Sequence, residues 1–217
     1  MAHPPFVLLG LLASVIGAWV VVEQVDVRLP GDRTGYEPDQ PILFSHQLHA
    51  GEMQVPCLYC HVGVERSRHA GVPPASVCMN CHKFVASTLA AVRAEERAAI
   101  EEARPPRPVL SPEIAKLYRA LGLDDAAKPV AGAVPKPIEW VRVHDLPDFV
   151  FFDHRSHVTQ GIVCATCHGD VASMQRVRQV NSLSMGWCVN CHRQTNLTGL
   201  PDGRPARAST DCSTCHY

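Results

Sequence analysis

The chain has 217 residues, of which 20 are basic and 21 acidic, and 46% of its residues are hydrophobic. This length fits one or two domains, and the nearly neutral charge argues against a nucleic acid as the partner. The 18 prolines and the aromatic content of only 6% predict short helices and loops with little sheet.

The first segment of the chain is an apolar run over residues 6–22 that contains no charged side chain. Its length is at the short end of what a transmembrane helix requires. A cleaved signal peptide is the alternative, but no Lys or Arg precedes the run and no small-x-small cleavage signal follows it. We therefore expect a membrane anchor over residues 1–25 and a connector over 26–43.

The segment Cys-x-x-Cys-His occurs five times and accounts for all ten cysteines of the chain. Two cysteines three apart on a helical turn can each form a thioether to the same haem, and the following histidine then becomes the proximal iron ligand. The motif therefore predicts five covalently bound haem c groups, at sites numbered here 1 to 5 in chain order. The sites are Cys57/Cys60/His61, Cys78/Cys81/His82, Cys164/Cys167/His168, Cys188/Cys191/His192 and Cys212/Cys215/His216.

Zinc knuckles and disulfides are the two other interpretations of these cysteines. A zinc site of four cysteines has no use for a histidine after every second cysteine. Disulfide frameworks follow no fixed Cys-x-x-Cys-His rule. Haem attachment also fits the length, because residues 57–216 leave only about 32 residues for each haem, too few for an ordinary core. We expect the porphyrins to form the core, and the chain without haem to be largely unfolded.

A second motif, Phe-x-His-x-x-His, precedes sites 1 and 2 at residues 44–49 and sites 3 and 4 at residues 152–157. This repetition predicts a duplicated two-haem module, over 44–83 and 140–193, with the fifth site in a C-terminal segment, 194–217. Residues 84–139 are expected to form a helical interlude and linker. Its first helix is predicted over 84–103, and its second is predicted to begin at Ser111, with serine as the N-cap, and to run to Gly122.

Five irons need five distal ligands if all are to be six-coordinate. Histidines three apart on a helical turn share one face and can serve two different irons, which accounts for four haems. The predicted ligands of these four are His46, His49, His154 and His157. The fifth iron has three candidate ligands, His144, Met185 and His69. A thioether ligand raises the reduction potential relative to a second imidazole.

Three further sequences carry a family resemblance: Trp-Val-Arg-Val-His-Asp-Leu-Pro at residues 140–147, Cys-Met-Asn-Cys-His at 78–82, and Met-Gly-Trp-Cys-Val-Asn-Cys-His-Arg at 185–193. With the duplicated motif, the chain resembles the class III multihaem cytochromes c. With the anchor as well, it looks more closely like the pentahaem subunit of alternative complex III, a quinol:electron acceptor oxidoreductase. The resemblance implies a multihaem cytochrome c fold, mostly short α-helices and irregular loops around stacked haems, with one N-terminal transmembrane helix.

The same resemblance implies a role in a respiratory or photosynthetic membrane complex. Other membrane and peripheral subunits, including iron-sulfur and monohaem cytochrome subunits, would oxidise quinol. The haems would relay the electrons to a periplasmic cytochrome, a small acceptor protein or a terminal oxidase. The expected location is the bacterial cytoplasmic membrane, with the haem domain on its periplasmic or outer face.

Two other functions stay open at this point. A self-sufficient quinol dehydrogenase would carry its own quinol site beside the first haem. A multihaem reductase would need an iron with an open coordination position, and the chain contains no Cys-x-x-Cys-Lys variant that would mark one. We therefore expect an electron-transfer subunit that is not catalytic alone.

Overall fold

The computed structural model describes residues 10, 14 and 32–217. Apart from Gly10 and Ser14, the predicted anchor over residues 6–22 lies outside the described residues. Within the described part of the chain, none of the helices is both long enough and apolar enough to cross a bilayer.

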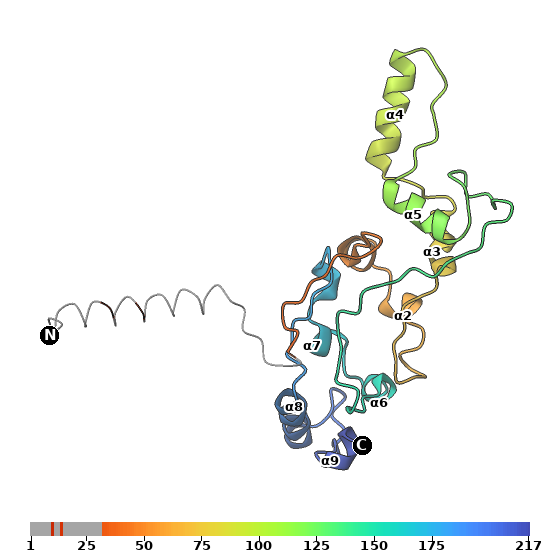
Figure 1. The fold of residues 1–217 in the computed structure, drawn as a ribbon. Helices are drawn as coiled ribbons and strands as arrows, with labels where there is room; N and C mark the ends of the chain where they lie inside the picture. The colour runs from red at the N-terminus through yellow and green to blue at the C-terminus, as the bar shows by residue number, and fades with distance from the viewer. Residues whose placement is uncertain (1–9, 11–13, 15–31) are drawn as a thin grey trace, which may run out of the picture.

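Residues 32–217 form short helices joined by loops (Figure 1). In this range the only β structure is a pair of isolated bridges, Leu123 with Pro129 and Val150 with His216, so the expectation of little sheet is confirmed there. The helices in chain order are η1 (Gln47–Glu52), α2 (Cys57–Cys60), α3 (Ala75–His82), α4 (Leu89–Glu101), α5 (Pro112–Ala120), α6 (His154–Val158), α7 (Ala165–His168), η2 (Val171–Ser173), α8 (Met185–Thr198) and α9 (Cys212–Cys215).

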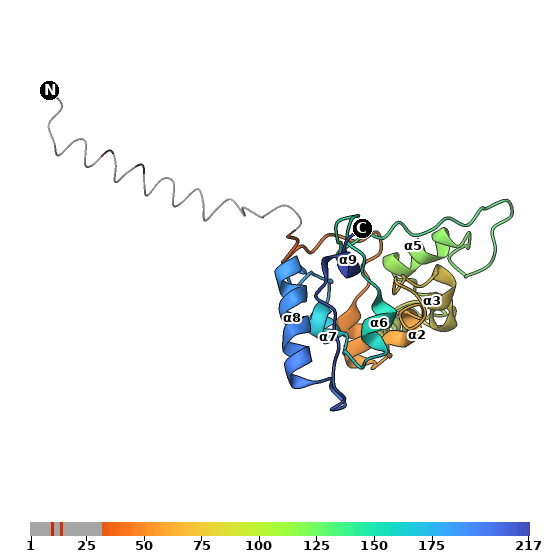
Figure 2. The same cartoon turned by 90° about the horizontal axis from the view of Figure 1, so that it is seen from below.

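The helices that carry the cysteine motifs follow one another across the molecule in an order that differs from the chain order. In Figure 1, α3 is followed by α2, then by α7 with α6, and then by α8 with α9; Figure 2 also shows α3 beside α2, with α6, α7 and α8 beyond them. Helix α5 packs on α3, and α4 projects beyond α5 at that end. The turns η1 and η2 pack together, and Gly51 allows this because a Cβ there would lie 2.3 Å from the carbonyl oxygen of Ala172.

Few apolar side chains of residues 32–217 are buried by the polypeptide alone. Those that are buried are Val64, Ala99, Leu117 and Tyr118. Many large apolar side chains stay exposed within and around the cysteine motifs, among them Leu58, Tyr59 and Phe149. Flat apolar cofactors would cover such side chains, so this distribution agrees with the expected porphyrin core.

The first helix of the interlude begins later than predicted. Instead of spanning 84–103, α4 begins at Leu89, where the side chain of Thr88 caps it by accepting a hydrogen bond from the backbone N–H of Ala91. The carbonyl of Val85 is engaged elsewhere, because it accepts a hydrogen bond from Nδ1 of His82 at 2.8 Å. The chain before Thr88 is thus committed to the second cysteine motif through Val85, and the helix starts only after the Thr88 cap.

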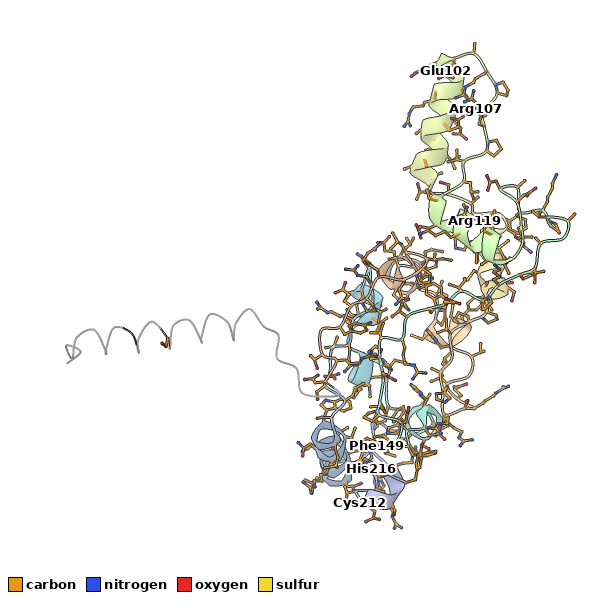
Figure 3. The ribbon with its side chains drawn as sticks, in the orientation of Figure 1. Glu102, Arg107, Arg119, Phe149, Cys212 and His216 are labelled. Carbon is orange, nitrogen blue, oxygen red and sulfur yellow. The ribbon has the colours of Figure 1, made fainter. Side chains whose placement is uncertain are left out.

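The segment after α4 turns back along the helix and is held there by Glu95. Its carboxylate accepts hydrogen bonds from the guanidinium of Arg104 at 2.5 Å and from the backbone N–H of Arg107 at 2.7 Å. These two donors, Arg104 first, lower the pKa of Glu95 to about 2. Figure 3 shows Glu102 and Arg107 at the far end of this projection, away from the cysteine motifs.

The second interlude helix, α5, has the predicted N-cap: the hydroxyl of Ser111 accepts from the backbone N–H of Glu113. The helix ends at Ala120, two residues before the predicted limit at Gly122. Its buried Tyr118 reaches α3, where its hydroxyl donates to the carbonyl of His82 at 2.6 Å. The interlude thus supports the helix that carries site 2.

We expect Tyr118→Phe to lower the free energy of unfolding of the haem-loaded protein by about 1–2 kcal/mol, because it removes the hydrogen bond from a buried hydroxyl to the carbonyl of His82. Chemical denaturation followed by circular dichroism would measure the change. Tyr217→Phe is the matched control. It also removes a hydroxyl bonded to a carbonyl, that of Asp148, but the residue is 81% exposed and should change stability by less than about 0.5 kcal/mol. Equal losses in the two variants would contradict the role of Tyr118.

Candidate haem sites

Each of the five motifs lies on a helical turn, as the spacing of its cysteines predicts. Sites 1 and 5 occupy the single-turn helices α2 and α9, each followed directly by its histidine. Site 2 forms the end of α3, site 3 spans the N-cap and body of α7, and site 4 lies within α8. The two thiols of each site are therefore close to one another on one helical turn.

The polypeptide does not enclose the ten cysteines evenly. Six are half-buried, whereas four are exposed: Cys57, Cys81, Cys164 and Cys212. Cys81 of site 2 differs in this respect from its half-buried partner Cys78. It lies in the last turn of α3, where its carbonyl accepts from the backbone N–H groups of Phe84 and Val85 at 2.9 and 3.0 Å. The helix end thus fixes the backbone of Cys81, but the chain alone builds no buried pocket around its thiol, and its thioether to haem stays a prediction from the motif.

Neighbouring thiols show how the sites follow one another. Four cysteines have a thiol pKa that is raised in part by a neighbouring site. In each case burial is the largest cause, and the second largest is the proximity of a cysteine that belongs to the adjacent site. The pairs are Cys78 with Cys60, Cys164 with Cys57, Cys167 (pKa about 11) with Cys191, and Cys188 with Cys215. The spatial order is therefore site 2, 1, 3, 4, 5, in agreement with the order of the helices in Figure 1.

Three histidine pairs are separated by the distance that an iron between them requires. An iron–nitrogen bond of about 2 Å on each side places the ring centroids of two axial imidazoles roughly 6 Å apart. In each pair one ring comes from a Phe-x-His-x-x-His motif and the other from a cysteine motif. The ring centroids are 6.1 Å apart for His49 and His82, 6.2 Å for His154 and His168, and 6.0 Å for His157 and His192.

The internal repeat extends this pairing to site 1. In the second module the first motif histidine faces the first site and the second faces the second site, and His49 with His82 obeys the same rule. The rule then pairs His46 with His61. Burial, followed by the proximity of His61 and His49, lowers the pKa of His46 to about 4. His46 is therefore neutral at pH 7, the form in which imidazole binds metal.

Six of the candidate ligands are held by the same device: Nδ1 donates a hydrogen bond to a backbone carbonyl, which leaves Nε2 for the metal. This bond fixes the tautomer and the ring orientation. The donors and acceptors are His49 to Ser45 at 2.8 Å, His61 to Gly71 at 2.6 Å, His82 to Val85 at 2.8 Å, His154 to Arg68 at 2.8 Å, His157 to Asp153 at 2.9 Å, and His192 to Ser209 at 2.5 Å.

The residues present fit a haem iron by a second criterion as well. Nδ1 of His46 is buried without any hydrogen-bond partner, and such an orphaned polar atom is costly inside a protein. Burial, followed by the proximity of His144, His154 and His61, lowers the pKa of His168 to about 4. Half-buried neutral imidazoles next to paired thiols match the donor set that a c-type haem requires.

The phenylalanines of the repeated motif pack on the candidate ligands in nearly identical ways. Phe44 lies edge-on to His46 with centroids 4.9 Å apart, and it stacks on His49 at 4.4 Å. Phe152 lies edge-on to His154 at 4.8 Å and packs on His157 at 4.8 Å and 31°. Each phenylalanine thus orients both histidines of its motif.

The residue between phenylalanine and histidine in this motif has a function that the sequence reasoning missed. Ser45 and Asp153 are both buried, and each caps its own helical turn: the hydroxyl of Ser45 accepts from the backbone N–H of Leu48, and the carboxylate of Asp153 accepts from that of Arg155. The backbone carbonyl of each also accepts a hydrogen bond from Nδ1 of the second histidine of its motif. Serine and aspartate are preferred N-cap residues, so the signal was present.

The three candidates for the fifth iron lie in different surroundings. The ring of His144 is 4.3 Å from that of His168 and nearly perpendicular to it, too close for the two rings to share an iron. Met185 is the first residue of α8, one turn before Cys188, and it is 69% exposed. His69 is exposed, and its ring makes no hydrogen bond within residues 32–217.

Site 5 closes the row at the C-terminus. Figure 3 shows Cys212, His216 and Phe149 together at this end. The ring of Phe149 is centred 5.8 Å from that of His216, and His216 forms the isolated bridge with Val150. This bridge ties the fifth site to the chain just before the second Phe-x-His-x-x-His motif.

Two comparisons bear on these sites. Residues 150–217 match the family described as cytochrome c7 and related cytochrome c. Over 235 aligned residues the chain is 25% identical to the menaquinone reductase multiheme cytochrome c subunit of Nitratidesulfovibrio vulgaris (strain Hildenborough), and the alignment covers 98% of this chain and 89% of that protein. The fold is therefore that of a multihaem cytochrome c built from short helices and loops, a class that binds haem c covalently.

We expect His49→Ala to convert one haem of the protein from low-spin to high-spin, because the iron facing His82 would lose its sixth ligand. Electron paramagnetic resonance of the oxidised protein would measure this change. His69→Ala removes an exposed histidine and should leave every haem low-spin. A high-spin signal in the His69 variant, or none in the His49 variant, would contradict the pairing.

Proposed function

We propose that the chain binds five haem c groups in one continuous row and relays electrons in a quinone-linked membrane complex, as the pentahaem subunit of an alternative complex III. The observation that carries the proposal is the row of sites 2, 1, 3, 4 and 5, in which sites 2, 3 and 4 each have a pair of imidazoles 6.0–6.2 Å apart. At each contact between neighbouring sites, a thiol of one site helps to raise the pKa of one cysteine of the other, so neighbouring haems would lie close together.

In this proposal each side chain has a defined task toward the haem. The ten cysteines tether the porphyrins, the histidines of the cysteine motifs bind the irons from one side, and the paired motif histidines bind four of them from the other. The haem irons supply the one-electron chemistry. The protein sets their potentials through the axial ligand, the hydrogen bond at Nδ1 and the degree of burial.

The arrangement favours conduction over catalysis at a haem. A reductase needs an iron with an open coordination position, whereas sites 1 to 4 each have a second imidazole available. A row also has two ends, so we assign the exchange of electrons with partners to sites 2 and 5. Site 2 lies beside the interlude helices α4 and α5, and site 5 lies at the C-terminus.

Met185 is the distal ligand that we propose for site 5. It lies at the start of α8, one turn before Cys188, which is close to Cys215 of site 5. The polypeptide leaves the side chain of Met185 largely uncovered. In contrast, Nε2 of His144 is enclosed beside the site 3 histidine, His168.

The test is a pair of substitutions. We expect Met185→Leu to remove the thioether ligand, producing a high-spin signal from one haem, while His144→Ala leaves all irons six-coordinate. Electron paramagnetic resonance and near-infrared absorption of the oxidised protein would measure both. A high-spin haem in the His144 variant would instead make His144 the ligand.

The direction of electron flow has a second candidate. The relative from N. vulgaris is named as a subunit of a menaquinone reductase, so a complex that delivers electrons to quinone is the alternative to one that withdraws them from quinol. The membrane anchor over residues 1–25 is proposed to hold the haem domain at the outer face of a bacterial cytoplasmic membrane in either case.

The proposal as a whole is tested by extracting the protein gently from membranes. We expect membrane and iron-sulfur subunits to co-purify, and the denatured chain to carry five covalent haem additions by mass spectrometry. Rapid mixing of quinol with the complex should reduce the haems, whereas the haems of the isolated chain should stay oxidised under the same conditions. Quinol oxidation by the isolated chain would favour the self-sufficient dehydrogenase, and a dominant high-spin haem would favour the reductase.

A further inference from the structure

We propose that the loop of residues 63–71, which belongs to the first module, sets the reduction potentials of sites 1 and 3 together. It would do so by holding one imidazole of each site through a backbone carbonyl. This inference rests on the proposed haem occupancy of the two sites.

The loop supplies two acceptors to two different sites. The carbonyl of Gly71 accepts from Nδ1 of His61, the proximal histidine of site 1, at 2.6 Å. The carbonyl of Arg68 accepts from Nδ1 of His154, which faces His168 of site 3, at 2.8 Å. The backbone N–H of His154 donates to the same carbonyl at 3.3 Å, so the loop holds both the ring and the main chain of this ligand.

The loop is fixed closely enough for this task. The carbonyl of Gly63 accepts from the backbone N–H groups of Arg66 and Ser67 at 3.0 and 2.8 Å. The other end folds back onto Gly63, where a Cβ would lie 3.0 Å from the carbonyl oxygen of Ala70 and 3.1 Å from that of His69. A movement at one end of the loop would therefore be transmitted to the other.

A side chain ties the loop to the second module as well. The guanidinium of Arg68 lies 4.8 Å from the ring centroid of Phe151, the residue before the second Phe-x-His-x-x-His motif. The boundary between the modules runs here, since the thiols of Cys57 and Cys164 also meet. Among the six anchored histidines, His154 is the one whose acceptor comes from the other module.

The physical effect has a definite sign. A hydrogen bond from Nδ1–H makes the imidazole more basic, which stabilises ferric iron and lowers the reduction potential. Weakening the bonds to Gly71 and Arg68 should therefore raise the potentials of sites 1 and 3. Because both respond in the same direction, the electron step between them keeps its driving force while the pair shifts relative to sites 2 and 4.

Gly71→Ala is the direct test. The residue has φ +77°, a conformation that strains any side chain, yet an added Cβ would touch nothing within 4 Å. The substitution thus changes the backbone and not the packing. Gly132→Ala, at the same φ of +77° and equally open but in the linker, is the matched control. Arg68→Ala is the second variant, with Arg68→Lys to restore the cation over Phe151.

The measurement is a redox titration of the purified, haem-loaded full chain followed by electron paramagnetic resonance. Variants His46→Met and His154→Met serve only to assign the signals of sites 1 and 3. In Gly71→Ala and in Arg68→Ala we expect the reduced-to-oxidised ratio of both sites to rise about fivefold at a fixed potential, as for the loss of one hydrogen bond. Gly132→Ala and Arg68→Lys should leave the ratios unchanged.

Several results would overturn the inference. The first is a change in the reduction potential of site 1 alone in the Gly71 variant together with a change at site 3 alone in the Arg68 variant. The second is no change in either variant. The third is an equal change in the Gly132 control. If Gly71→Ala does not load haem, the Arg68 pair decides. The titration needs neither quinol nor partner subunits, so failure of the relay in a complex and failure of this inference are distinguishable.

Discussion

The structure depends on pairs of facing imidazole rings that the polypeptide itself holds in place. A ring is useful as an iron ligand only if its Nε2 is aimed, and the hydrogen bond from Nδ1 to a carbonyl achieves this. Because residues 32–217 bury few apolar side chains without haem, the helices of this part of the chain cannot position these rings by ordinary core packing. Short-range devices do so instead: a motif phenylalanine against two histidines, and a capping residue beneath them.

The features that could be predicted from the sequence are those encoded over a few residues. The helical turn under each cysteine motif follows from the spacing of the cysteines, and the N-cap of α5 follows from Ser111 and Pro112. The correspondence between the two modules also follows from the sequence. The packing of Phe44 and Phe152 on their histidines repeats within a few tenths of an ångström, which shows that the repetition is structural.

The acceptors of the ligand hydrogen bonds could not be predicted, because a backbone carbonyl leaves no trace in the sequence. Gly71, Arg68 and Ser209 become functional through the path of the chain and not through their side chains. The late start of α4 has the same origin, since the carbonyl of Val85 is already committed to His82. Ser45 and Asp153 are a different case: both are recognisable caps, and alignment of the two motifs would have identified them.

The order of the sites follows from how a duplicated module joins to its copy. The two modules meet through their first sites, 1 and 3, where Cys57 lies against Cys164 and the 63–71 loop reaches His154. Their second sites, 2 and 4, are consequently directed outward. A fifth site follows site 4, so the row ends in site 2 of the first module on one side and in the appended site 5 on the other. The interlude helices flank one end and the C-terminus forms the other, so the two ends of the row present different polypeptide surfaces.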